Sequence, residues 1–333
     1  MNTEVPANFI LMTTISNKTK YEYIYRVNRA IDYIWAHAVE NLDLGKIAKE
    51  ACLSKYHFHR IFHNQMGETV NEFVRRQRLE FAFFKLGVEE NKSITEIALE
   101  CGFSSSQNFT KAFKKHFDVS PKFVRGEYNW YKMRGIGGPV NKLSEKEDLP
   151  RTIYCSDTGH EWINSLTKKV REQKRPMRVN VVEMPSFHLA YIRIIGHDHE
   201  KHRQARKKIS LWAKERGLLN ENSLLIGVLN SDGFVTTPEK FSYDICLTIP
   251  RKYININERL NIRDIPGGKY AVYHCETDKH DTEEEWVRLF IDWLPSSGYK
   301  IDTRHAYQIY CNDYDEHPLK HMIADLCIPI KLI

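Results

Sequence analysis

Residues 94–117 read ITEIALECGFSSSQNFTKAFKKHF, and residues 44–67 read LGKIAKEACLSKYHFHRIFHNQMG. One apolar pattern is common to both stretches, 50 residues apart: Leu44-x-x-Ile47-Ala48-x-x-Ala51 recurs as Ile94-x-x-Ile97-Ala98-x-x-Cys101. In each copy a short apolar helix ends at a tight break, residues 52–54 or 102–104, and a second helix starts at once. A helix that braces a second helix against the major groove is a helix-turn-helix. The repeat therefore predicts two helix-turn-helix units.

The segments around the repeat also favour helices. Apolar residues at the three-and-four spacing of a buried face predict a first helix between Tyr21 and Val39. Thr69-x-x-Glu72 and Ser93-x-x-Glu96 each match a capping box, and Ser120-Pro121 is a third start signal.

A longer helix is expected between the two units, from about Val70 to Leu86. It would measure about 25 Å at 1.5 Å per residue. It could hold both units on one face of a duplex, whose successive major grooves lie roughly 34 Å apart. One chain would then suffice to bind DNA, and dimerisation stays open.

The second helix of each unit leaves a polar face beside its apolar one. That face carries His59, Arg60 and His63 in the first unit and Gln107, Asn108 and Lys111 in the second. Arginine can pair with guanine, and asparagine or glutamine can pair with adenine. Lys114, Lys115 and Arg125 are expected to hold phosphates. A solvated helix face is the alternative for any one of these side chains.

Length and charge agree with this organisation without proving it. At 333 residues, with 42% hydrophobic and 28% charged residues, the chain is too long for one core and too apolar to be disordered. Residues 21–134 carry 18 Lys and Arg against 14 Asp and Glu, whereas residues 176–333 carry 21 against 22. The excess of positive charge lies mainly in the N-terminal part, where nucleic acid would bind.

The sequence contains no segment with the roughly 20 apolar residues of a membrane span, and its N-terminal run Phe9-Ile10-Leu11-Met12 is shorter than the roughly 7 to 15 apolar residues of a signal peptide. Its seven cysteines are scattered, without a Cys-x-x-Cys pair. We therefore expect a cytoplasmic protein with reduced thiols and no contact with the membrane.

The second half has a different texture, following a Gly-, Pro- and charge-rich tether at 135–150. Four strands are expected, at 179–182, 188–195, 224–229 and 243–249, with a helix over 201–216 between the second and third. Shifting this unit by 81 residues aligns it with the rest of the chain, including Asp244 with Asp325 and Cys246 with Cys327. A duplicated strand-helix-strand-strand unit predicts an antiparallel sheet with two helices on one face and a ligand-sized groove between them.

The stretch from Ile97 to Pro121 resembles the signature of the AraC/XylS-type transcription regulators, and the similarity extends from about Tyr25 to Arg125. The resemblance implies base contacts from the exposed faces of both second helices, at Tyr56, His59, Arg60, Ser106, Gln107 and Lys111. Asp118 departs from the family, in which many members have glycine. We expect this departure to alter only a helix-end turn.

Residues 178–333 resemble the GyrI-like ligand-binding domain, through Val182-Glu183-Met184-Pro185, Ile265-Pro266-Gly267-Gly268 and Trp293-Leu294-Pro295. In multidrug-binding members aromatic side chains line the pocket, and the acid of a Glu-x-Tyr motif meets cations. Here that motif reads Gln308-Ile309-Tyr310, which weakens the attraction for a cation and favours a neutral or anionic ligand. The pocket residues expected are Tyr273, Trp293, Tyr307, Gln308 and Tyr310, with Trp212 weaker. Packing in the sheet core is the alternative for each aromatic.

Two histidine groups raise the question of a metal. His57, His59 and His63 lack a carboxylate or thiolate to complete a site, and a polar loop before a helix accounts better for His197-x-His199-x-x-His202. We therefore predict neither a metal nor a cofactor.

The domains predicted are an all-α double helix-turn-helix domain at 21–134, a linker at 135–177 and a GyrI-like α+β domain at 178–333. We expect a bacterial, sequence-specific transcription regulator, not an enzyme, whose C-terminal domain binds a small-molecule effector. Its partners would be double-stranded promoter DNA and RNA polymerase. Two alternatives stay open for the C-terminal domain: a hydrolase of electrophilic small molecules, as reported for some GyrI-like relatives, and a module that binds a protein.

Overall fold

A computed structural model describes residues 17–38, 40, 42–89, 91–127, 175–231, 235–253, 260–278 and 282–333. Most of the predicted linker, including a short helix expected at 161–171, lies outside these ranges. The chain divides into two compact units, Met1–Val74 with Ile254–Asn261 and Arg75–Tyr253 with Ile262–Ile333. Within the ranges given above, no helix combines the length and apolarity needed to cross a bilayer.

The first unit contains the first helix-turn-helix. Its helices are α1 (Asn17–Ala36), α2 (Leu44–Glu50), α3 (Lys55–Met66) and the start of α4 (Val70–Val88). Its core includes Val27, Ile31, Ile34, Ile47, Phe58, Phe62 and Phe73. The first helix begins earlier than predicted and ends at Ala36, so Ala38 is only half-buried. The rings of Phe62 and Phe73 meet edge to face, 5.4 Å apart, and connect α3 with α4.

The second unit begins with the second helix-turn-helix. Its helices are the rest of α4, α5 (Ile94–Glu100), α6 (Ser106–Phe117) and α7 (Pro121–Glu127). Phe83, Phe109, Phe113 and Phe117 form its buried aromatic centre. All three predicted start signals are confirmed by hydrogen bonds that close the first turns of α4, α5 and α7.

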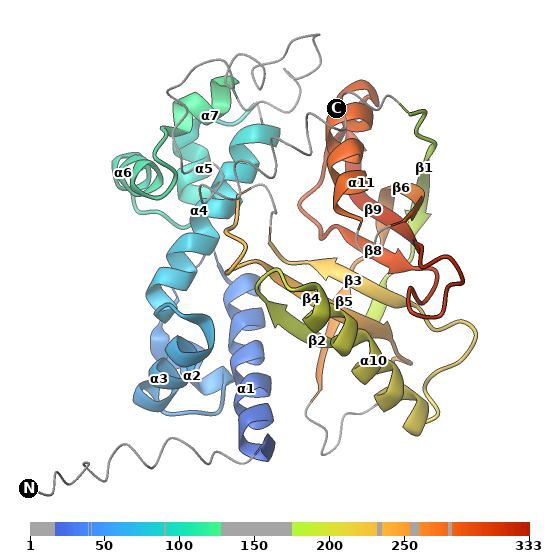
Figure 1. The fold of residues 1–333 in the computed structure, drawn as a ribbon. Helices are drawn as coiled ribbons and strands as arrows, with labels where there is room; N and C mark the ends of the chain where they lie inside the picture. Colours follow the sequence, from blue (N-terminus) through green and yellow to red (C-terminus); the bar gives the residue numbers. More distant parts are fainter. Residues whose placement is uncertain are drawn as a thin grey trace, which may run out of the picture. The chain divides into compact units, whose positions relative to one another are not determined.

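The remainder of the second unit is a nine-stranded sheet with helices (Figure 1). In chain order the elements are β1 (Val179–Met184), β2 (Phe187–Ile195), α10 (His199–Glu215), β3 (Leu225–Leu229), β4 (Ser242–Thr248), β5 (Asn261–Ile265), β6 (Gly268–Thr277), α11 (Glu283–Arg288), β7 (Tyr299–Ile301), β8 (Tyr307–Tyr310) and β9 (Met322–Leu332). The strand order is β1-β6-β9-β8-β3-β4-β2-β5, with β7 added on β9. The pairs with a known register, such as β3 with β8 and β6 with β9, are antiparallel.

The duplication predicted from the sequence is confirmed by this topology. A shift of 81 residues carries β1, β2, β3 and β4 onto β5, β6, β8 and β9, and it carries α10 onto α11 with its continuation. When each strand is replaced by its counterpart in the other half, the strand order reads the same from the opposite edge of the sheet. A pseudo-twofold axis therefore passes between β3 and β8. Gly227 and Gln308 are 81 residues apart and are partners in that central pair.

The halves differ at the second helix. α10 is continuous over 17 residues, whereas α11 passes into a π-helical turn, Leu289–Trp293, and a 3₁₀ turn, Leu294–Ser296. Pro295 has no amide hydrogen to continue the ladder of hydrogen bonds, and the last helical turn ends one residue later, at Ser296.

Alternation along the strands divides the core of this domain between the two faces of the sheet. Tyr273 and Leu326 lie on the face beneath α11, with Leu289 and Trp293. Tyr191, Tyr270 and Tyr307 lie together on the opposite face and are almost completely buried.

Candidate functional site

The two helix-turn-helix turns have the same hydrogen bonds. In the first, the amides of Cys52 and Leu53 donate to Lys49 O and Ala48 O at 2.9 and 3.0 Å. In the second, the amides of Gly102 and Phe103 donate to Leu99 O and Ala98 O at the same two distances. These bonds satisfy carbonyls that the helix end leaves open. The sequence repeat is thus a structural repeat.

Left-handed backbone is needed twice in each unit, and the two units place their glycines differently. At the turn, Gly102 has φ +77° whereas Cys52 has φ +51°. At the end of the second helix, Gly67 has φ +66° whereas Asp118 has φ +57°. Each unit therefore has one non-glycine residue in a conformation that favours glycine. Asp118 occupies the C-cap of α6, which is the helix-end turn where the departure from glycine was expected to act.

Serines begin both second helices. Ser54 Oγ accepts the amide of His57 at 3.3 Å, and Ser105 Oγ accepts the amide of Asn108 at 3.2 Å. Both helices therefore begin with a capped first turn.

Most of the predicted base-reading residues lie on exposed faces. Within α3, Tyr56, His59 and Arg60 are exposed, and the side chain of Tyr56 is 80% exposed. Phe58, Ile61 and Phe62 are buried on the other face. Within α6, the exposed set is Gln107, Asn108, Lys111, Lys114 and Lys115, and Ser106 is half-buried.

Arg125 does not have the geometry expected of a phosphate contact. Its Nε donates to Leu86 O at 3.1 Å and its Nη1 donates to Lys92 O at 2.6 Å. Two guanidinium nitrogens therefore connect α7 to the chain around the end of α4. The sequence shows a basic residue one turn into α7, but only tertiary structure shows the carbonyls that it meets.

The histidines of α3 lie in two different environments. His57 lies edge-on to Tyr23 of α1, with ring centroids 5.4 Å apart, and His59 and His63 are exposed.

In the C-terminal domain a cavity of about 490 Å³ lies between α10 and α11. Its walls carry both charged and aromatic groups. They are His197, His199, Glu200, His202, Arg203, Arg206, Leu229, Phe241, Tyr243, Thr282, Glu283, Trp286, Gln308, Tyr310, Tyr314, Asp315 and Met322. This is the groove expected along the pseudo-twofold axis.

Gln308 lies in the floor of the cavity, beside the axis. Its Oε1 accepts the hydroxyl of Thr282 at 2.6 Å and the indole N–H of Trp286 at 3.4 Å. The amide oxygen is therefore already bonded, which leaves the NH₂ group as the donor that Gln308 can offer a ligand.

Tyr243 and Tyr310 lie across the floor from each other, with hydroxyl oxygens 3.2 Å apart. Arg206 lies over the ring of Tyr310, 4.9 Å from its centroid. A Cβ at Gly227 would lie only 1.8 Å from the Tyr243 hydroxyl, so glycine is required there for the Tyr243 ring to fit. Burial raises the pKa of Tyr243 well above its usual value, so it stays a neutral phenol.

Four of the six predicted pocket residues do not line this cavity. Tyr307 alternates with Gln308 along β8, so it faces the opposite side of the sheet and packs on Tyr270, 5.0 Å between centroids. Tyr273 donates its hydroxyl to Glu285 at 2.8 Å. Trp293 stacks on Tyr299, and Trp212 meets Tyr253. For these four aromatics the structure shows packing, the alternative left open by the sequence.

The sequence missed Tyr243, Arg206, Trp286 and Glu283 as cavity residues. Tyr243 lies in an expected strand, but alternation alone does not show which face of the sheet meets the groove. The others lie on helices, where only the tertiary structure shows which side faces the groove.

Beneath this domain's surface lies a buried charge cluster. Asp244 accepts two hydrogen bonds from Arg193, both at 2.7 Å, and one from Arg263 Nη1 at 2.7 Å. Burial opposes ionisation of Asp244, but the two arginines hold its pKa below the usual value. The cluster connects β2 and β4 of the first half of the duplication to β5 of the second half.

Comparison with known proteins gives two family matches. A GyrI-like small molecule binding domain matches residues 177–331, and a helix-turn-helix domain matches residues 47–127. PqrA of Proteus vulgaris, described as a probable transcription factor, is 44% identical over 86 residues, 26% of this chain and 70% of that protein. A DNA gyrase inhibitor of Yersinia enterocolitica is 25% identical over 140 residues, 41% of this chain and 88% of that protein. The right origin-binding protein of Escherichia coli is 34% identical over 127 residues, 35% of this chain and 44% of that protein.

Proposed function

Because this chain belongs to the AraC-type family of DNA-binding transcription regulators and carries a GyrI-like small-molecule binding domain, we propose that α3 and α6 read promoter DNA and that the α10–α11 cavity binds the effector. The observation that carries the proposal is the pair of capped second helices, each buried on one face and polar on the other.

On this proposal the polar residues of α3 and α6 divide into two roles. Arg60, Gln107, Asn108 and Lys111 contact bases, and Lys114 and Lys115, in the last turn of α6, hold phosphates. Tyr56, His59 and Ser106 complete the contact surface. Arg125 is left out because carbonyl oxygens already accept two of its guanidinium nitrogens.

The test is competition between a selected promoter and random duplex at 150 mM salt. Arg60→Ala is expected to cost about 1 to 3 kcal/mol and to relax selectivity at one base pair, whereas Lys114→Ala should weaken all sequences alike. Arg251→Ala, at an exposed site of the C-terminal domain outside the cavity, is the control and should leave DNA affinity unchanged. Equal losses on every sequence for Arg60→Ala and Lys114→Ala would contradict the division of roles.

For the effector, the support is the cavity floor. Gln308 carries no charge, and the hydroxyls of Tyr243 and Tyr310 add polar groups to walls that carry both aromatic and charged side chains. We infer a ligand that is neutral or anionic and offers hydrogen-bond acceptors.

Thermal shifts on a metabolite and drug panel test this inference. Gln308→Glu should move the preference towards cations, because it restores a carboxylate to the floor. Trp212→Phe, outside the cavity, should leave the ranking of ligands unchanged. If Gln308→Glu does not alter the ranking either, the ligand lies elsewhere or the domain binds a protein.

We also propose that the C-terminal domain binds its ligand without transforming it. The carboxylate on which a hydrolase of this kind would depend is replaced by Gln308, whose oxygen is held by Thr282 and Trp286. Product formed from a panel of electrophiles, and abolished by Tyr310→Phe, would support the hydrolase instead.

The remaining parts of the proposal concern organisation. We propose that the domains span residues 21–134 and 178–333, with a linker at 135–177. One chain binds each operator, and RNA polymerase is the second macromolecular partner. The protein acts in the cytoplasm, where promoter DNA lies. Sedimentation of the complex with a single operator duplex tests the stoichiometry, and two chains per duplex would contradict it.

A further inference from the structure

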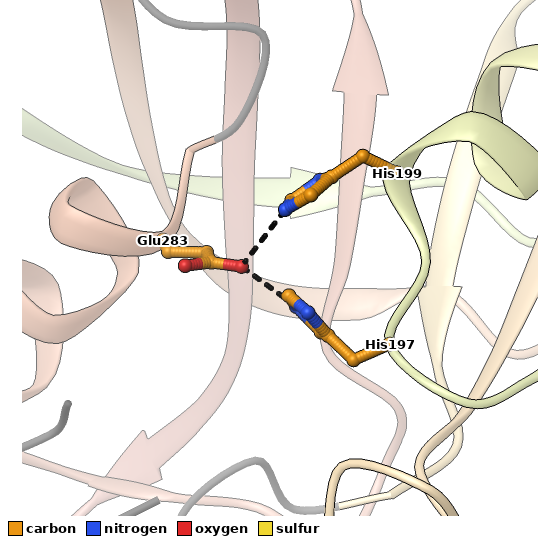
Figure 2. Close-up of side chains that lie close together, drawn as sticks. All are labelled: His197, His199 and Glu283. Carbon is orange, nitrogen blue, oxygen red and sulfur yellow. Dashed lines mark ion pairs between the residues drawn. The ribbon is translucent and has the colours of Figure 1, made fainter. Parts of the chain in front are cut away.

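Three side chains converge on one wall of the α10–α11 cavity (Figure 2). His197 and His199 come from the end of the β2–α10 loop and the first turn of α10, and Glu283 is the first residue of α11. Glu283 Oε1 lies 2.6 Å from His197 Nε2 and 3.7 Å from His199 Nε2. One candidate ligand atom from each of the three residues can be chosen so that all lie within 4.8 Å of one another.

Two imidazoles and one carboxylate form a known donor set for transition metals. Zinc binds histidine nitrogen at about 2.0 to 2.1 Å and carboxylate oxygen at about 2.0 to 2.2 Å, which places tetrahedral ligand atoms roughly 3.3 Å apart. The 3.7 Å separation is close to that value, and the 2.6 Å separation must widen by roughly 0.7 Å.

The spacing of these three residues along the chain does not predict that they meet. A polar loop before a helix accounts for His197 and His199 in the sequence alone. Glu283 follows 84 residues after His199 and joins them only because the duplication places the starts of α10 and α11 across one groove.

A third histidine lines the same cavity. The ring centroid of His202 lies 6.4 Å from those of both His197 and His199, and it stacks on Tyr243 at 4.8 Å. Its Nε2 is buried and has no hydrogen-bond partner among the described residues. Beside a three-ligand metal, this nitrogen is a partner for a metal-bound water or effector atom.

We propose that His197, His199 and Glu283 form a binding site for a divalent transition metal ion, with a fourth coordination position open to the effector cavity. Zinc is known to take three protein ligands with its fourth position left to water or another small molecule. The ion would connect α10 to α11 and thereby join the two halves of the duplication. It requires neither DNA nor an effector for binding, so it stands apart from the function proposed above.

The experiment titrates the metal-free full chain with Zn²⁺ by calorimetry and with Co²⁺ by visible absorption. One equivalent is expected to bind, with Co²⁺ bands typical of nitrogen and oxygen ligands and no thiolate charge-transfer band. Glu283→Gln and His199→Ala should each weaken Zn²⁺ at least 10-fold. His199→Asp, which keeps a metal-binding group, should recover part of the affinity.

A second cluster supplies the matched control. It consists of His274, Cys311 and Asp325, each of which offers one possible ligand atom within 4.8 Å of the other two. His274 Nδ1 lies 2.6 Å from Asp325 Oδ1. His274→Ala should leave the first equivalent of Zn²⁺ unchanged. A thiolate band that disappears in Cys311→Ala, or wild-type affinity in the double variant His199→Ala and Glu283→Gln, would overturn the proposal. Circular dichroism of each variant verifies that it is folded.

Discussion

Gly102 and Cys52 hold equivalent left-handed positions in the two helix-turn-helix turns, and substitutions there should change the free energy of unfolding in opposite directions. Gly102 has φ +77°, a conformation that costs an L-residue with a side chain roughly 1 to 2 kcal/mol. A Cβ there would also lie 2.9 Å from Cζ of Arg78, whose Nη1 donates to Gly102 O at 3.0 Å. Displacing that guanidinium removes a hydrogen bond worth about 1 kcal/mol. After the smaller entropy of the unfolded alanine chain is subtracted, Gly102→Ala should lose about 2 kcal/mol.

Cys52 holds the corresponding position of the first unit at φ +51° without being glycine. Cys52→Gly removes the strain but adds chain entropy to the unfolded state, so a net gain of about 0.5 kcal/mol is expected. Gly126→Ala is the control, because Gly126 lies inside α7 and a Cβ there meets nothing within 4 Å. It should gain about 0.5 to 1 kcal/mol from helix propensity.

Hydrogen–deuterium exchange on the full chain measures these effects locally, since amides in α5–α6 and α2–α3 report the opening of each unit. Gly102→Ala should reduce protection over residues 94–117 roughly 30-fold, and Cys52→Gly should leave or increase protection over residues 44–67. Unchanged protection in Gly102→Ala, or an equal loss in Cys52→Gly, would show that backbone strain does not govern these turns.

Three further predictions concern the C-terminal domain. Asp244→Asn removes a carboxylate that two arginines share and should lower the free energy of unfolding, measured in urea, by about 3 kcal/mol. Asp264→Asn, at an exposed ion pair, is the control and should lower it by less than about 1 kcal/mol. Similar losses in the two variants would contradict the difference in burial. Burial lowers the pKa of His305 to about 4 from an ordinary 6.5, so protons bind the unfolded chain preferentially between these values. The contribution of neutral His305 to the free energy of unfolding is fully present above pH 6.5 and should fall by about 2 kcal/mol from pH 7.5 to pH 5. His305→Gln should reduce this fall. An identical pH profile in that variant would show that His305 is not its source. Gly227→Ala should displace Tyr243, lower the melting temperature and reshape the cavity floor, and an unchanged thermal-shift ranking of ligands would show that Tyr243 does not contact them.

Local signals in the sequence predicted much of the N-terminal part. A helix-turn-helix is built from contacts a few residues apart, so apolar spacing and caps such as Ser93 with Glu96 are visible in one dimension. The burial of Phe109 and Phe113 and the exposure of Gln107 and Lys111 follow from the same helical period. Arg125 was the exception, because its carbonyl partners at Leu86 and Lys92 are more than 30 residues away.

The residues that line the cavity could be predicted only in part from the sequence. The duplication predicted a groove on a pseudo-twofold axis, and it placed Gln308 beside that axis. Aromatic composition did not identify the lining, because sheet alternation turns Tyr307 away from the side that Gln308 faces.

By itself the sequence determined the two helix-turn-helix units and the duplicated sheet domain, since these depend on periodic patterns and repeats, and its resemblance to a known family indicated the class of regulator. Only the tertiary structure decided which side chains meet in the cavity, and above all that Glu283 joins His197 and His199. The physical reason is that strand pairing and helix packing bring together residues whose separation along the chain carries no information about their distance in space.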